Sequence, residues 1–118
     1  MQTPLRRRVL APLLGVAAGG LCIAAVEMAA HALASGDTLF VAAAAGLALG
    51  ALVGGSLAAW LAGGRAYAWA VGVMLFCLAL ANVLSFPHPV WFVPVAAIAV
   101  AAGAWLAARV VFRPAAPE

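Results

Sequence analysis

Four long apolar stretches constrain this chain more than any other feature of its sequence. They cover about residues 9–33, 40–61, 67–84 and 90–109 of the 118. About 20 apolar residues in helical form cross the hydrocarbon core of a bilayer. Hydrophobic residues make up 69% of the chain and charged residues only 8%, and a soluble domain of this size buries too little surface to hide them. We therefore predict an all-α membrane protein with a single transmembrane domain over residues 1–118.

The connectors between the apolar stretches are short and contain residues that end helices. Residues 34–38, 63–65 and 85–89 hold Gly, Ser, Asp and Pro, which favour helix ends and turns. Short connectors place consecutive helices side by side in opposite directions. The sequence thus predicts an antiparallel bundle of four transmembrane helices whose solvent is the lipid bilayer.

The basic residues predict the orientation of this bundle. All six are arginines and flank the stretches, at Arg6, Arg7, Arg8, Arg65, Arg109 and Arg113. In a four-span chain these positions fall on one side of the membrane, whereas the loop that holds Asp37 falls on the other. The positive-inside rule then predicts that both termini are cytoplasmic. We expect the membrane to be the inner membrane of a bacterial cell. Because the arginines sit at span ends, we expect no nucleic-acid partner.

A cleaved signal peptide is the alternative interpretation of the first stretch. Arginines, an apolar run and the small residues at 32–34 before Ser35 have that form. However, the apolar run is longer than the usual signal segment and contains Glu27. We expect it to remain as a span; cleavage would leave three spans.

Small residues at helical spacing predict where the helices touch. They are Gly46, Gly50 and Gly54 in the second stretch, Gly15 and Gly19 in the first, and Gly103 in the fourth. Helices in lipid associate through close backbone contact at such residues. We interpret these glycines as packing positions within one chain, and the alternative is a homodimer seam through the second stretch. The alanine-rich spans predict a tight bundle without a large central cavity.

Polar side chains gather at one depth of the predicted bundle, on the side opposite the arginines. They are Glu27 and His31 in the first stretch, Asn82 in the third, His88 in the next loop, and Trp91 at the start of the fourth. Glu27 and His31 are four residues apart and share a helix face. Because a charge facing lipid is costly, we expect this face to point into the bundle as a buried polar cluster.

Three roles fit this cluster. The first is a structural clamp, in which Glu27, His31 and Asn82 bond across helices. The second is a proton or substrate site, because an acid inside a membrane helix is a functional candidate by default. The third is a metal site with Glu27, His31 and His88 as ligands, but the spacing alone is weak evidence, so we expect no metal and no other cofactor.

No sequence motif of a hydrolase, a phosphate-binding loop or a zinc protease occurs in the chain, so we do not expect an enzyme. The sequence favours a small integral inner-membrane protein with a structural or accessory role. The alternative is a proton-coupled small-molecule transporter that acts as a homo-oligomer and uses Glu27 as its proton and substrate site.

Several segments resemble a group of small uncharacterised bacterial four-span membrane proteins. They are residues 27–31 (EMAAH), 50–55 (GALVGG), 62–65 (AGGR), Asn82 and 87–92 (PHPVWF). The resemblance implies the same four-span topology and no particular activity. A looser likeness, in layout alone, is to the small multidrug resistance transporters, whose span-one glutamate exchanges protons for cationic drugs. It implies such a part for Glu27, although Glu27 lies in the outer half of its span and the second and third stretches lack the expected aromatic and polar pocket residues.

Overall fold

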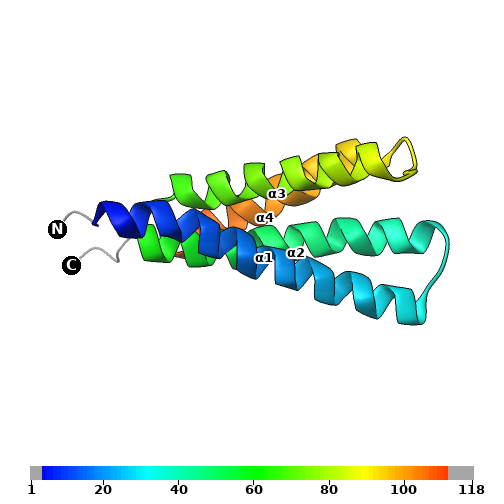
Figure 1. The fold of residues 1–118 in the computed structure, drawn as a ribbon, viewed down its shortest axis with the longest axis horizontal. Coiled ribbons are helices and arrows are strands. Elements are labelled where there is room, and N and C mark those ends of the chain that lie inside the picture. Colours follow the sequence, from blue (N-terminus) through cyan, green and yellow to red (C-terminus); the bar gives the residue numbers. More distant parts are fainter. Residues whose placement is uncertain (1–3, 112–118) are drawn as a thin grey trace.

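The structure, a computed structural model, describes residues 4–111 as four helices. They are α1 (Leu5–Leu33), α2 (Asp37–Ala62), α3 (Ala66–Ser85) and α4 (Phe92–Val111). All four are long and apolar enough to cross a membrane, and consecutive helices run in opposite directions (Figure 1). The predicted fold class, an antiparallel four-transmembrane-helix bundle, is confirmed. The chain is a multi-pass membrane protein.

The helix ends differ from the predicted span ends because local signals set them. α1 begins at Leu5 rather than near residue 9, because the three arginines continue the helix. α2 begins at Asp37 rather than Phe40, where the carboxylate in the first turn interacts favourably with the helix dipole. α2 ends against Gly63, whose φ of 75° is in the left-handed region and favours glycine after a helix.

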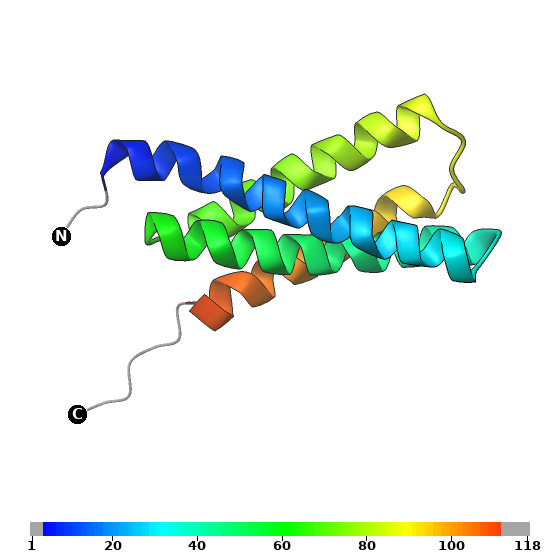
Figure 2. The ribbon, with the colours of Figure 1, turned by 60° about the horizontal axis from the view of Figure 1, so that its bottom comes forward.

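Helix α2 lies at the centre of the bundle and contacts the other three helices, whereas α1 and α4 do not contact each other. Figure 2 shows α1 lying along one side of α2 and α4 crossing on the other. Two of the most central residues, Ala51 and Ala58 of α2, are fully buried. α2 is therefore the one helix on which all the other three pack.

The contact between α1 and α2 is made by glycines from both helices. A Cβ built on Gly15 would lie 2.6 Å from the Gly54 carbonyl oxygen, and one built on Gly19 would lie 2.7 Å from the Gly50 carbonyl oxygen. Such distances are too short for any side chain, so the two backbones touch directly. Gly46 faces Val26 of α1. The prediction that these glycines pack within the chain is confirmed, and this face of α2 is covered.

The opposite face of α2 packs on α4 through small residues in the same way. A Cβ on Gly103 of α4 would lie 2.9 Å from the Ala51 Cβ, and one on Gly55 would lie 3.1 Å from the Ala107 Cβ. Gly72 brings α3 equally close to Ala104 of α4. Small side chains on both faces of α2 allow three helices to surround it closely.

The bundle is narrow at one end and splayed at the other. We call the narrow end, with the start of α1, the 63–65 connector and the end of α4, the arginine end. The opposite end, with the 34–36 and 86–91 connectors, is the open end. α1 and α3 meet at Gly15 and Val71, and again at Gly19 and Leu75. Beyond that level α3 diverges from α1 toward the open end (Figures 1 and 2).

Arg6, Arg7, Arg8, Arg65 and Arg109 lie at the arginine end, as the four-span prediction requires. Arg113 lies outside the described residues. The Arg109 guanidinium stacks over the Trp105 ring, 4.8 Å from its centre. Both cysteines, Cys22 and Cys77, are free thiols.

Candidate functional site

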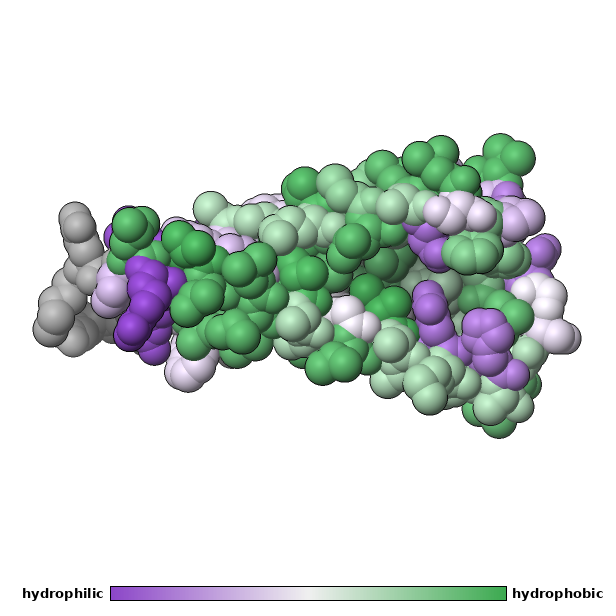
Figure 3. Space-filling model, in the orientation of Figure 1, coloured by the Kyte–Doolittle hydropathy of each residue, from purple (hydrophilic) through white to green (hydrophobic). Residues whose placement is uncertain are grey.

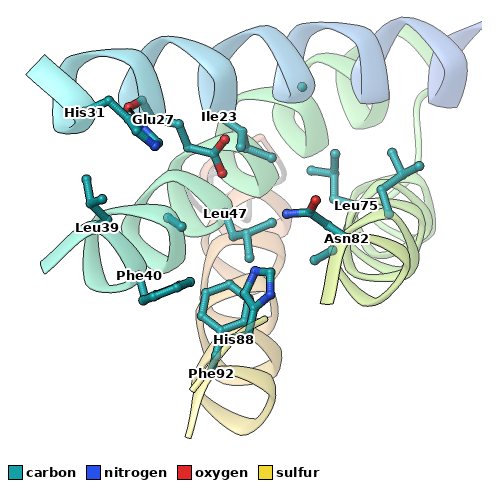
Figure 4. A pocket seen from close by; sticks show the side chains of 14 residues that line it. Ile23, Glu27, His31, Leu39, Phe40, Leu47, Leu75, Asn82, His88 and Phe92 are labelled. Carbon is teal, nitrogen blue, oxygen red and sulfur yellow. Dashed lines mark hydrogen bonds between the residues drawn. The ribbon is translucent and has the colours of Figure 1, made fainter. Parts of the chain in front are cut away.

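A cavity of about 510 Å³ occupies the open end of the bundle. Its walls come from α1 and α3, and α2, His88 and Phe92 complete the lining (Figure 4). The sequence predicted a tight bundle without a large central cavity, and the bundle is not tight at this end. The glycine contacts that close the bundle stop at the level of Gly19 and Leu75, and beyond it no small-residue pair draws α1 and α3 together.

Helix α1 contributes a continuous stripe to the cavity. Gly20, Ile23, Glu27 and His31 follow each other at intervals of three or four residues and all line it. This spacing keeps side chains on one helix face, so the predicted shared face of Glu27 and His31 is confirmed. The stripe begins one residue beyond Gly19, where α1 leaves its contact with α3.

The Glu27 carboxylate points into the cavity (Figure 4) and is half-buried. Among residues 4–111, no hydrogen bond or ion pair reaches this carboxylate. The neighbouring His31 ring does not bind it. Instead, Nδ1 of His31 donates to the Glu27 backbone carbonyl at 2.8 Å within the same helix. This bond leaves Nε2 as the His31 ring nitrogen available to a ligand or water.

Asn82 lies on α3, across the cavity from Glu27, and its amide points into the cavity (Figure 4). Within the described chain the amide makes no hydrogen bond to Glu27 or His31. The structural clamp across helices is therefore not formed, because α1 and α3 have diverged at this depth. The expected burial is also wrong, since Asn82 and His31 are exposed and no polar side chain in residues 4–111 is buried.

His88 belongs to an aromatic group at the outer rim of the cavity. Its ring centre lies 5.2 Å from that of Phe40 and 4.9 Å from that of Phe92. The two phenylalanine rings stand edge to face at 6.0 Å, a favoured aromatic geometry. Nδ1 of His88 donates to the Phe86 carbonyl at 2.7 Å, which fixes the ring within its loop. We call Phe40, His88 and Phe92 the aromatic trio.

Trp91, the remaining predicted member, does not line the cavity. Its ring packs edge to face on Phe92 at 6.3 Å, so it supports the aromatic trio from behind. Phe40 is a further site residue, which the sequence did not single out. Its signal was present, because Phe40 stands at the start of the second apolar stretch, at the depth of the polar side chains. This residue supplies an aromatic wall that the second span was expected to lack.

Few ionisable side chains line the cavity. Its titratable lining groups are Glu27, His31 and His88, and no arginine lines it. No three His, Cys, Asp or Glu residues come close enough to hold a metal ion within residues 4–111, so the metal alternative lacks an assembled ligand set there.

The lining pairs a half-buried carboxylate with aromatic ring faces and one amide. Carboxylates and aromatic rings both attract cations. The cavity therefore has the chemistry to hold a small molecule that carries a positive group or a proton to be exchanged.

Protein-family models, curated proteins and solved structures contain no match to this chain, so the resemblance to small four-span bacterial proteins stays a prediction.

Proposed function

We propose that this chain is a proton-linked small-molecule transporter, with the open-end cavity as its binding site and Glu27 as the shared proton and substrate site. The unpartnered Glu27 carboxylate carries the proposal. A carboxylate near hydrocarbon is held at a cost of several kcal/mol unless a proton or an opposite charge neutralises it. Within the described chain no arginine lines the cavity and the His31 ring bonds the helix backbone instead, so a proton or a bound ligand is the natural partner.

The shape of the bundle supports the same proposal. The cavity is open at one end and closed at the other, where glycine contacts seal α1, α2 and α3 together. A volume of about 510 Å³ lies within the roughly 300–1,000 Å³ range of small-molecule sites. A transporter must expose such a site to one side at a time, and this arrangement has the form of one such state.

A structural or accessory role is the competing proposal. It drew its support from a polar clamp between α1 and α3, and that clamp is absent among the described residues. It would leave Glu27 insensitive to small molecules, which makes the two proposals separable by experiment.

The setting of the transporter is proposed from the arginines. Five of them lie at the arginine end, so we place that end in the cytoplasm and the cavity mouth on the outer side of a bacterial inner membrane. If the protein acts as a homo-oligomer, its copies meet through a face other than the glycine face of α2, which α1 covers.

The test follows the protonation of Glu27 in lipid by infrared difference spectroscopy. The purified protein is titrated with acid alone and with hexyltrimethylammonium, hexanol or hexanoate. Because a bound cation stabilises the carboxylate over the protonated acid, the cation should shift the Glu27 titration to lower pH, while the other two probes leave it in place. His31 and His88 also line the cavity, and a protonated ring on either would oppose cation binding, as a proton on Glu27 does.

The control pair uses the two acids within the described chain. Glu27→Gln should abolish the shift, whereas Asp37→Asn, which changes an exposed acid outside the cavity, should retain it. Uptake of radiolabelled hexyltrimethylammonium into vesicles, driven by a pH gradient, should follow the same pattern. A titration shift without uptake would mean that the protein binds the cation but does not transport it. A Glu27 titration that none of the three probes changes would favour the accessory role.

A further inference from the structure

The cavity lining changes from apolar to polar along the bundle axis. At its deep end, nearest the arginine end, lie Gly20, Ile23, Leu47 and Leu75. At its outer end lie one further leucine, Leu39, and the polar groups and rings, Glu27, His31, Phe40, Asn82, His88 and Phe92. A ligand that matches this lining has an apolar part pointing toward the membrane centre and a polar part pointing outward.

The depth of this gradient matches one leaflet. From Gly20 to His31, helix α1 rises about 16 Å at 1.5 Å per residue, and the hydrocarbon of one leaflet is about 15 Å thick. The polarity order in the cavity is thus the order that a lipid of the outer leaflet has, with its head outward and its chain inward.

The cavity also opens sideways. α1 and α3 form its two walls but separate beyond Gly19 and Leu75. Figure 3 shows polar side chains on both sides of a hollow at this end, with mostly apolar surface between it and the polar atoms at the arginine end. Leu78, on the α3 wall, is 58% exposed, so apolar surface continues from the cavity to the outside of the bundle. A membrane-dissolved molecule can reach the site without first leaving the bilayer.

The polar end of the lining selects the charge of the ligand head. It contains one unpartnered carboxylate, the aromatic trio, an amide and the His31 ring, and no arginine of the described chain. An anionic head would meet the Glu27 carboxylate, whereas an ammonium group gains both the carboxylate and the ring faces. The volume suits one chain rather than the two chains of a phospholipid.

We infer that the cavity binds single-chain amphiphiles with an ammonium head, taken laterally from the outer leaflet between α1 and α3. The head lies between Glu27 and the aromatic trio, and the chain runs toward Gly20 and Leu75. This inference rests on the proposed small-molecule site and adds the substrate class and the route.

The test uses dodecyltrimethylammonium with a photoreactive diazirine at the end of its chain, incorporated into lipid nanodiscs that hold the protein. After illumination, mass spectrometry should find labels at the deep end, on peptides with Ile23, Leu47 and Leu75. Unlabelled dodecyltrimethylammonium should displace the probe at a mole fraction about tenfold below that of dodecanol, the ratio given by about 1.4 kcal/mol. Glu27→Gln should erase this ratio, and Asp37→Asn should keep it.

A second variant tests the chain position without touching the head site. No atom lies within 4 Å of a Cβ built on Gly20, so Gly20→Leu starts from an unobstructed Cβ and should extend its side chain into the deep end. It should weaken competition by the dodecyl compound several-fold and leave the water-soluble hexyl compound unchanged, whereas Gly20→Ala should change neither by more than about twofold.

The outcomes separate the two proposals. If the hexyl and dodecyl cations competed equally, with Glu27 still required and no effect of Gly20→Leu, that result would overturn the amphiphile inference and leave the transporter proposal standing. Labels confined to outward-facing residues such as Leu49 would overturn it as well. If Glu27→Gln and the unchanged protein behaved alike in both the infrared titration and the competition experiment, both the transporter proposal and the amphiphile inference would be overturned.

Discussion

At the residue scale, two adjacent glycines have opposite surroundings. Gly19 is buried, and a Cβ there would lie 2.7 Å from the Gly50 carbonyl oxygen. Gly20 is half-buried and has no atom within 4 Å of that position. The same substitution should therefore change the free energy of unfolding in opposite directions at these neighbouring positions, because only Gly19 lies in a helix contact.

We expect Gly19→Ala to lower the free energy of unfolding by about 1–3 kcal/mol, since the added methyl forces α1 and α2 apart. Gly20→Ala should raise it by up to about 1 kcal/mol, because alanine restricts the unfolded chain without a clash. Reversible unfolding in mixed detergent and dodecyl sulfate micelles measures both. Equal effects at the two positions would contradict the described packing of α1 on α2.

The predictability of the site also differs from residue to residue. The common face of Glu27 and His31 follows from helical spacing alone, and their depth relative to Asn82 follows from antiparallel threading. The absence of a bond between them does not follow, because it depends on how far α1 and α3 diverge. That divergence arises from where the glycine contacts stop, which the glycine spacing in one helix does not reveal.

At the element scale, the 86–91 connector is held to the bundle by His88. The ring packs between Phe40 of α2 and Phe92 of α4, and Nδ1 donates to the Phe86 carbonyl at 2.7 Å. His88 thereby fixes the outer rim of the cavity and the start of α4. The position of His88 near the membrane surface could be predicted from the sequence. Its ring partners could not, because they come from α2 and α4 and depend on how these helices are arranged in space.

Replacing this ring should loosen the connector. His88→Ala should lower the free energy of unfolding by about 1–3 kcal/mol, through the lost hydrogen bond and ring contacts. His88→Phe should recover part of it by restoring the stacking. The matched control is His31→Ala, since His31 is exposed and bonds only within its own helix among the described residues, and its cost should stay below about 1 kcal/mol.

Unfolding in mixed micelles measures these variants, and proteolysis within the 86–91 connector provides an independent readout. Faster cleavage is expected for His88→Ala alone. If His31→Ala proved as damaging as His88→Ala, the aromatic trio would not be what anchors the connector.

At the scale of the whole molecule, two asymmetries coincide. Toward the arginine end, which carries five of the arginines, glycine contacts hold the helices together, and the open end is splayed and carries Glu27, Asn82 and His88. The number of spans and the side of each arginine could be predicted from apolar stretches and charge alone. The splay could not, because it depends on the combined geometry of five contacting helix pairs, only three of which include α2.

The charge asymmetry decides from which side the cavity is reached. Positive flanks stay on the cytoplasmic side during insertion, since the anionic inner surface and the membrane potential both oppose their transfer.

In a background of Cys22→Ala and Cys77→Ala, we expect Ser35→Cys at the open end to react with an impermeant maleimide in intact bacterial cells. Ala66→Cys at the arginine end should react only after lysis, and both positions are exposed, so a difference in labelling reports the compartment rather than burial. Replacing Arg6, Arg7 and Arg8 by alanine should reduce the contrast. If Ala66→Cys were the one labelled in intact cells, the cavity mouth would face the cytoplasm, and a ligand of the outer leaflet could no longer reach Glu27 by the route between α1 and α3.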